Sequence, residues 1–190
     1  MERRVLVPSI AVAIVAAIAT AWVTVAVRRR NAQPTAAVAA PAAPAATAPS
    51  RKIKARLFYV SMDGTKLTGI DREIAYGDGP SAQAQEIVTA QLAAAPPALV
   101  SAIPPGTTLR ALYLNAKGEA YVDLSKEIAS AHTGGSQDEL LTIYAIVNAL
   151  TANLPAVTSV QLLVDGKEVD TLAGHIDLRK PLEKNLDVVE

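Results

Sequence analysis

The stretch Ser136–Leu154, SQDELLTIYAIVNALTANL, decides how the folded part of this chain is organised. Its apolar residues recur at steps of three and four, which predicts an amphipathic helix. They are Leu140, Ile143, Tyr144, Val147, Leu150 and Leu154. Ser136 and Glu139 have the spacing of a capping box at the start of this helix, and Pro155 ends it. An apolar stripe this wide needs a partner surface, so we expect strands to flank the helix.

Strand patterns do flank the helix on both sides. Charged and apolar residues alternate near the start of the folded part, and turn signals such as Asp63-Gly64 and Asp165-Gly166 separate the segments. Strands are predicted over 53–59, 66–75, 107–114, 119–124 and 157–164, with a second helix over 80–95. We therefore predict an α+β domain, a small mixed β-sheet with two amphipathic helices packed on one face.

The N-terminal residues 1–30 predict a membrane anchor. Val5–Val27 is uncharged and almost wholly apolar, and as a helix it would extend about 34 Å, enough to span the hydrocarbon core. A cleaved signal peptide is the alternative, but the run exceeds the usual core of about 7–15 residues. Arg3 and Arg4 compete with Arg28–Arg30 for the cytoplasmic side, so charge alone leaves the orientation open.

Residues 31–50, rich in alanine and proline, predict an extended linker to a domain at 51–190. Residues 1–50 carry five arginines and one glutamate, so residues 51–190 hold 13 basic and 17 acidic residues. This mildly acidic balance argues against nucleic acid as a partner. The chain has no cysteine, which excludes disulfides, thiolate metal sites and a lipid-modified cysteine anchor.

Several stretches, taken in order, resemble the GerMN domain of sporulation and spore germination proteins. They are IPPGTTLRALYLNAKGEAYVDLSKEI from Ile103, the pair Gly134-Gly135 before SQDELLTIYAIVNAL, and VTSVQLLVDGKEVDTLAGHIDLRKPL from Val157. The resemblance extends roughly from Leu57 to Leu182, nearly all of the predicted domain. No single motif is specific, but the ordered set is.

The resemblance implies an exported domain tethered at the cytoplasmic membrane, with a fold similar to the ring-building modules of secretion and sporulation channels. Many members are lipoproteins, whereas this chain has an apolar run and no cysteine. It has one copy of the domain where some relatives have two. No catalytic activity or cofactor is implied. We expect a single-pass, non-enzymatic module that binds or assembles envelope components on the periplasmic or cell-wall side. The alternative is a peptidoglycan-binding accessory or hydrolase of wall remodelling.

The residues themselves predict no catalytic, cofactor or metal site. His132 and His175, the only histidines, are 43 residues apart and have no cysteine to join them. Asp123 lies at the end of the strand predicted over 119–124 and Ser125 follows it, where such residues make local turn bonds, and Ser136 fits a helix cap. Contact with a polar ligand is the alternative role for these three residues.

A possible interaction surface follows from strand alternation. If the helices cover Leu57, Leu109, Val122 and Leu162, alternation turns a second apolar set to the opposite face. That set is Phe58, Leu112, Leu114, Tyr121 and Leu163. The segment 66–75 or the C-terminal tail could cover these residues, or they could form a surface for an envelope protein or for self-association. Besides such a partner, we expect the lipid bilayer to contact Val5–Val27, with peptidoglycan as a further candidate.

Overall fold

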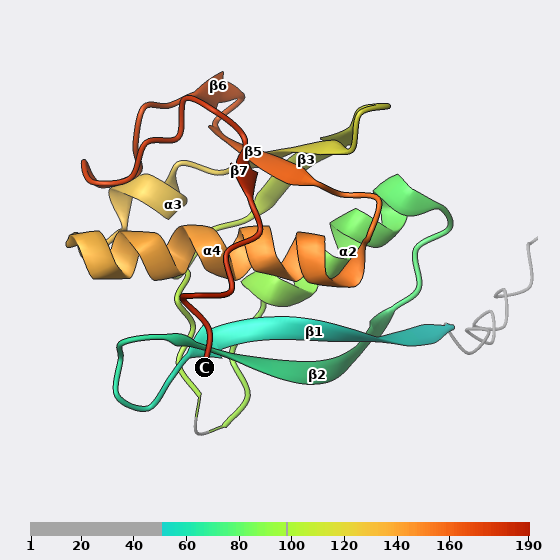
Figure 1. Cartoon of the computed structure of the whole chain (residues 1–190), viewed down its shortest axis with the longest axis horizontal. Coiled ribbons are helices and arrows are strands. Elements are labelled where there is room, and N and C mark those ends of the chain that lie inside the picture. The colour runs from blue at the N-terminus through green and yellow to red at the C-terminus, as the bar shows by residue number, and fades with distance from the viewer. Residues whose placement is uncertain (1–50, 98) are drawn as a thin grey trace, which may run out of the picture. The chain divides into compact units, whose positions relative to one another are not determined.

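Figure 1 shows the computed structural model, which describes residues 51–97 and 99–190. The predicted membrane span Val5–Val27 and the linker 31–50 lie outside the described residues. Within the described ranges, no helix is both long enough and apolar enough to cross a bilayer.

The first two strands form a sheet of their own. β1 (Lys52–Val60) pairs antiparallel with β2 (Leu67–Ala75), and the two form a two-stranded sheet. The Asp63 carboxylate shapes the connecting turn by accepting hydrogen bonds from the Ser61 hydroxyl and the Thr65 N–H, at 2.7 and 3.0 Å. The hairpin is therefore defined locally, as the Asp-Gly turn signal predicts.

The remaining strands form a second, mixed sheet. Its strand order is β3 (Leu109–Leu114), β4 (Glu119–Leu124), β5 (Ser159–Val164) and β6 (Lys167–Glu168), and β7 (Leu182–Glu183) also pairs with β5. β4 and β5 are parallel, whereas the other pairs are antiparallel. A parallel pair needs a crossover, and the long helix between β4 and β5 supplies it.

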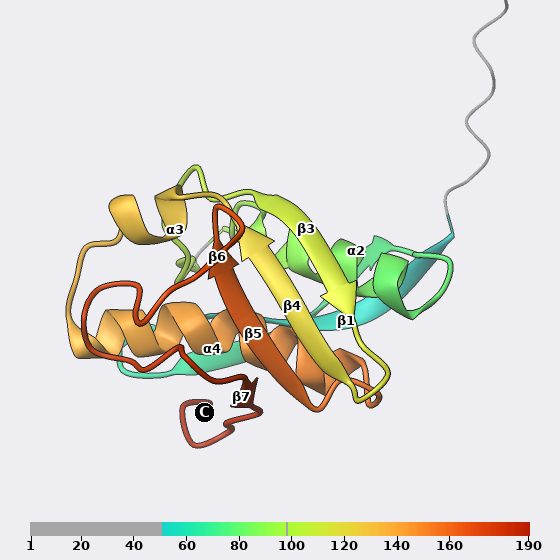
Figure 2. The ribbon, with the colours of Figure 1, turned by 90° about the horizontal axis from the view of Figure 1, so that it is seen from above.

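Helices α2 (Pro80–Leu92) and α4 (Ser136–Asn153) lie between the two sheets, as Figures 1 and 2 show, and α3 (Glu127–Ser130) is a short turn before α4. The predicted α+β class and the two helices are confirmed. The prediction of a single sheet is wrong, because the first hairpin packs on the opposite side of the helix layer.

Helix α4 is buried on more than one side. The predicted positions Ile143, Val147 and Leu150 are fully buried, but Ala145 and Ile146 on another flank are fully buried too. A helix packed on a single sheet would leave that flank in water. The position between two sheets therefore explains why the buried surface of α4 is wider than the predicted stripe.

A bulge in β3 changes which residues face the helices. The register between β3 and β4 shifts between Leu109 and Ala111, so that Leu112 lies opposite Val122 on the inner face. Leu112 is only 4% exposed, whereas Tyr113, which alternation would place inside, is 63% exposed. The predicted outward orientation of Leu112, and of Leu114 two residues on, is therefore wrong.

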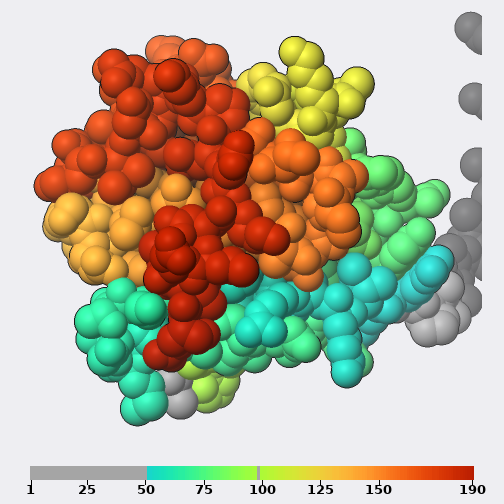
Figure 3. All heavy atoms as spheres, viewed as in Figure 1, coloured from blue at the N-terminus to red at the C-terminus, as the bar shows by residue number. Residues whose placement is uncertain are grey.

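The C-terminal tail covers part of the hairpin. Leu67 donates its N–H to the Val188 carbonyl oxygen and accepts the Glu190 N–H, and Figure 3 shows the red tail reaching the hairpin. Phe58 is 1% exposed and borders a hollow that Leu186 and Val189 of the tail also line. Phe58 is thus a core residue and not part of an open surface.

Side-chain amides from the helix layer hold the free edge of β1. Gln91 of α2 accepts the Phe58 N–H at 2.8 Å and donates to the Phe58 carbonyl oxygen at 2.6 Å. Asn153 of α4 does the same for the N–H and carbonyl groups of Arg56, with both distances 2.8 Å. Each amide takes the place of a neighbouring strand, because a buried backbone polar group must find a partner.

Replacing Gln91 with methionine tests this contact. Gln91→Met keeps the side-chain length but leaves the buried N–H and carbonyl groups of Phe58 without partners, so we expect a loss of about 2–4 kcal/mol of stability. The measurement is urea unfolding followed by circular dichroism. The exposed Gln85 on the same helix is the control, and Gln85→Met should change stability by no more than about 0.5 kcal/mol. Equal effects at both positions would contradict the role of Gln91.

Candidate functional site

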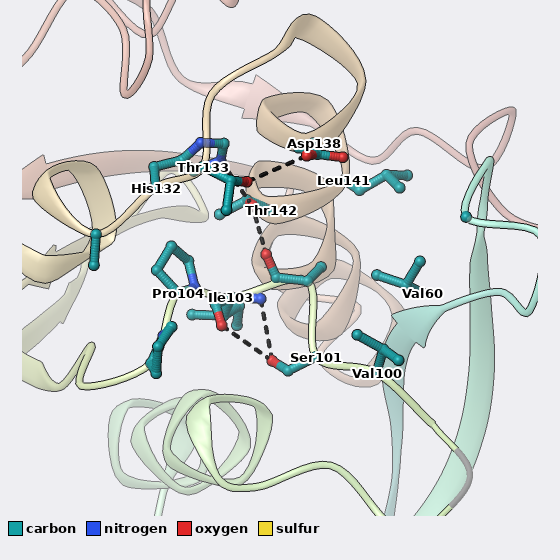
Figure 4. Close-up of a pocket in the computed structure, with 14 residues that line it drawn as sticks. Val60, Val100, Ser101, Ile103, Pro104, His132, Thr133, Asp138, Leu141 and Thr142 are labelled. Atoms are coloured by element: carbon teal, nitrogen blue, oxygen red, sulfur yellow. Dashed lines mark hydrogen bonds between the residues drawn. The ribbon is translucent and has the colours of Figure 1, made fainter.

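One hollow of the described residues is a groove of about 290 Å³, which we call the Val100 groove (Figure 4). It lies where the hairpin, the loop before β3, the segment after α3 and the first turns of α4 meet. Its lining residues are Val60, Gly64, Val100, Ser101, Ala102, Ile103, Pro104, Pro105, Ala131, His132, Thr133, Asp138, Leu141 and Thr142. Most of these side chains are apolar.

The loop before β3 forms one wall and is held in place by local bonds. Val60 donates its N–H to the Val100 carbonyl oxygen at 2.9 Å, which joins the loop to the end of β1. The Ser101 hydroxyl oxygen accepts the Ile103 N–H at 3.1 Å. The Thr107 hydroxyl donates to the Pro104 carbonyl oxygen at 2.8 Å, closing the proline turn. The wall is therefore fixed before any ligand arrives.

The polar groups beside this wall form a continuous chain of hydrogen bonds. His132 Nδ1 accepts the Gly134 N–H at 2.9 Å, which leaves Nε2 as the protonated nitrogen facing Thr142 at 3.1 Å. Thr142 in turn donates its hydroxyl proton to the Ala102 carbonyl oxygen at 2.6 Å. Each member of the chain therefore has a structural partner within the protein.

The groove is suited to receiving an apolar group. Val100 is 65% exposed at its rim, whereas Leu141 is buried in its wall. His132 and Thr142 are committed to each other and to backbone groups, and Thr133 donates to the Asp138 carboxylate at 3.2 Å. These polar side chains are thus bonded within the protein, and most of the remaining lining side chains are apolar.

Glu139 has a different role from the predicted one. Gly135 occupies the N-cap position of α4, Ser136 is the first helical residue, and no side chain caps the helix, so the predicted capping box is wrong. Glu139 is fully buried and turns toward the C-terminal segment. One carboxylate oxygen accepts the N–H groups of Leu172 and Ala173, at 2.8 and 2.9 Å.

The other oxygen of the Glu139 carboxylate binds His175. It accepts the His175 N–H at 2.8 Å and lies 3.1 Å from His175 Nδ1. Burial alone raises the pKa of the Glu139 carboxyl. The hydrogen bonds that it accepts outweigh burial, so the pKa lies below its usual value; they come from the N–H groups of Ala173, His175 and Leu172 and from the imidazole of His175. An ionised carboxylate therefore anchors the tail to α4.

Asp123 and Ser125, predicted as turn residues or ligand contacts, have partners inside the protein. Asp123 accepts the Gly166 N–H at 2.7 Å in the turn after β5, and it lies 3.3 Å from Arg110. Arg110 also pairs with Asp165 at 2.6 Å. Ser125 accepts the Thr108 N–H at 3.0 Å, whereas Ser136 stays exposed at the start of α4. Asp123 and Ser125 brace the mixed sheet.

The other predicted surface residues do not gather at the groove. Tyr121 and Leu163 are partly exposed on the outer face of the mixed sheet, and Leu114 at the end of β3 lines two other hollows together with Pro80. Within residues 51–97 and 99–190, no group of three or more histidine, aspartate or glutamate side chains could hold a metal ion. The two histidines have separate partners: His132 bonds to Thr142, and His175 bonds to Glu139.

Sequence reasoning missed Val100, Tyr113 and the buried role of Glu139. Val100 lies in a loop with no periodic pattern, so only its place beside the end of β1 reveals it. Strand alternation places Tyr113 on the wrong face, because the bulge at Arg110 leaves no clear mark in the sequence. A glutamate among apolar residues in a helix was the available signal for Glu139.

The fold defines a small α+β domain with an apolar groove. The family model described as "Germane: Sporulation and spore germination" matches residues 56–170, more than half of the chain. The chain therefore belongs to this family of sporulation and spore germination domains, as the resemblance indicates. No curated protein matches the chain.

Solved structures support the same fold. A candidate lipoprotein from Clostridium perfringens is 26% identical, with a TM-score of 0.50, and the match covers 70% of this chain and 88% of that one. The tandem GerMN domains of the sporulation protein GerM from Bacillus subtilis are 16% identical, with a TM-score of 0.54. That match covers 70% of this chain and 46% of the tandem, so this chain spans less than half of the GerM pair.

Replacing Glu139 with glutamine tests the anchored tail. The amide would turn an NH₂ group toward N–H donors, so Glu139→Gln should cost about 2–4 kcal/mol of stability at pH 7. The pKa of Glu139 is lowered on folding, so its contribution is present above the unfolded value of about 4.3 and is lost as pH falls through the folded value.

We expect the variant to lose this part of the pH dependence, measured by urea unfolding between pH 3 and 7. The neighbouring Asp138 is exposed and bonds only Thr133 in the described residues, so Asp138→Asn is the control and should stay within about 0.5 kcal/mol. Parallel pH curves for Glu139→Gln and the unchanged protein would refute the anchoring role.

Proposed function

We propose that this protein is a non-catalytic binding or assembly module of the bacterial cell envelope. Val5–Val27 holds it in the cytoplasmic membrane, and the domain at 51–190 acts on the extracytoplasmic side. Its family describes sporulation and spore germination domains, and its relative from Clostridium perfringens is a candidate lipoprotein, a class of protein found at membranes. Both support a place in the envelope.

The observation that carries the proposal is the Val100 groove. Its walls are apolar and held by backbone contacts, and His132 and Thr142 are bonded within the protein. A side chain of a partner can bury apolar surface there without displacing any of these bonds, and burial of that surface favours binding. A preformed apolar groove with an exposed valine at its rim is typical of a docking site.

The expected location can be measured directly. Periplasmic alkaline phosphatase fused after Glu190 of the full chain should be active, whereas green fluorescent protein of the ordinary cytosolic type should stay dark at the same position. The control is a variant that lacks residues 1–30, fused to each reporter in turn. On this variant the phosphatase should be inactive and the green fluorescent protein should fluoresce. Activity of the cytosolic reporter in the full chain would place the domain inside the cell and refute the envelope proposal.

The groove can be tested at Val100, because its side chain is 65% exposed and a substitution there removes little core packing. Val100→Asp in the full chain should abolish co-purification of the partner from detergent-solubilised membranes, since a buried unpaired charge is costly. Leu186, which is 54% exposed away from the groove, gives the matched control Leu186→Asp. Thermal unfolding of both variants checks that they are folded.

The alternative function, a hydrolase of wall remodelling, predicts turnover of peptidoglycan. Release of soluble fragments from purified peptidoglycan by the full chain, abolished by Asp123→Asn or His175→Ala in a folded protein, would replace the proposal with a hydrolase. Co-sedimentation with peptidoglycan without release of fragments would identify the wall itself as the partner. We expect neither result, since Asp123 and His175 are bonded to structural partners.

A further inference from the structure

The outer face of the mixed sheet carries a second set of exposed side chains, which we call the Tyr113 face. Tyr113 on β3 lies directly across from Tyr121 on β4, and Figure 2 shows no ribbon crossing these strands on the outer side. Tyr113 is 63% exposed, which is high for an aromatic side chain on a sheet. The face consists of Tyr113, Tyr121, Leu163, Glu119 and Glu168.

The carboxylate of Glu119 is held beside this aromatic pair. It accepts a hydrogen bond from the Asn115 amide at 2.6 Å and another from the Tyr121 hydroxyl at 3.3 Å. Glu168 adds a second carboxylate on β6, across from Leu163 on the same face. Rings and carboxylates are therefore arranged together before any partner binds.

Glu119 and Glu168 give the described part of this face a negative charge. Within the described residues, no lysine, arginine or histidine forms an ion pair with Glu119 or Glu168. Arg110 on β3 is engaged by Asp123 and Asp165. The negative charge of Glu119 is the main cause that raises the pKa of Tyr121, followed by burial, the hydrogen bond to Glu119 and the charge of Glu168. The potential at the ring is thus suited to a cation.

The protein already contains the contact that such a face would make with a partner. The guanidinium carbon of Arg51 lies 3.9 Å from the ring centroid of Tyr76, a cation–π contact. Tyr76 is 37% exposed with its cation in place, whereas the more exposed Tyr113 has no such contact among the described residues. Charge complementarity therefore favours a basic partner over an anionic polymer or membrane surface.

We propose that the Tyr113 face is a docking surface for a basic segment of a partner protein. One arginine or lysine side chain of the segment lies against Tyr113, with its charge facing Glu119, and a second faces Glu168, which is three strands away on β6. The hydrocarbon stems of these side chains cover the ring of Tyr121 and Leu163. This inference rests on the proposed role as a binding module and names the chemistry of the partner.

The test uses the full chain in nanodiscs of zwitterionic lipid, which do not attract basic peptides. The probe is a fluorescent penta-arginine peptide, followed by anisotropy. The double variant Glu119→Gln with Glu168→Gln, and separately Tyr113→Ala, should each weaken binding about tenfold. Binding to the unchanged protein should also weaken as salt is raised from 50 to 300 mM.

The matched control removes two carboxylates elsewhere. Glu183 and Asp187 are exposed in the tail, so Glu183→Gln with Asp187→Asn changes net charge equally and should leave binding unchanged. Equal weakening by both double variants would mean a response to net charge alone and would overturn the proposal. Thermal unfolding of each variant checks that it is folded.

Two further probes identify other occupants. Stronger binding of an N-acetylglucosamine tetramer than of penta-arginine, lost in Tyr113→Ala, would assign the face to glycan and overturn the proposal. A dimer of the full chain that Tyr113→Ala abolishes would assign it to a second copy, with the same consequence. If the Tyr113 variants bind penta-arginine normally while Val100→Asp still abolishes partner co-purification, this inference fails and the proposed function stands.

Discussion

The burial of helix α4 between two sheets is the constraint on which the rest of this structure depends. A helix packed on one sheet can point its polar residues into water, but α4 has sheets on both sides. Its polar side chains Glu139, Thr142 and Asn148 are all buried. Since a buried polar group without a partner is costly, each one has to bind a neighbouring segment.

These partners explain how segments distant in sequence are joined. Asn148 accepts the Asn185 N–H at 3.0 Å and donates to its carbonyl oxygen at 2.7 Å. Glu139 holds the tail near Leu172, and Thr142 holds the loop before β3 at Ala102. The tail contacts at Leu172 and Asn185 lie beyond residue 170, where the match to the family model ends. The helix layer thus organises both the shared domain and the segment that follows it.

The two candidate contact surfaces are formed by different parts of the fold. The Val100 groove depends on the end of the hairpin meeting the first turns of α4, whereas the Tyr113 face depends on the register of the mixed sheet. The groove is apolar and its polar groups are satisfied internally, so it suits an apolar side chain. The Tyr113 face combines rings with carboxylates that form no ion pair within the described residues, so it suits a cation. The proposed module therefore has two chemically distinct surfaces for contact.

The sequence by itself determined the element types, the long helix and its end near Pro155, the hairpin turns and the family, because periodicity and turn chemistry are local. Only the tertiary structure decided that the strands divide into two sheets, since strand alternation and turn chemistry do not specify which strands pair across the helices. It also decided that Glu139, Phe58 and Leu112 are buried. Their environments are set by the distant tail and by a one-residue bulge, and neither leaves a periodic signal in the chain.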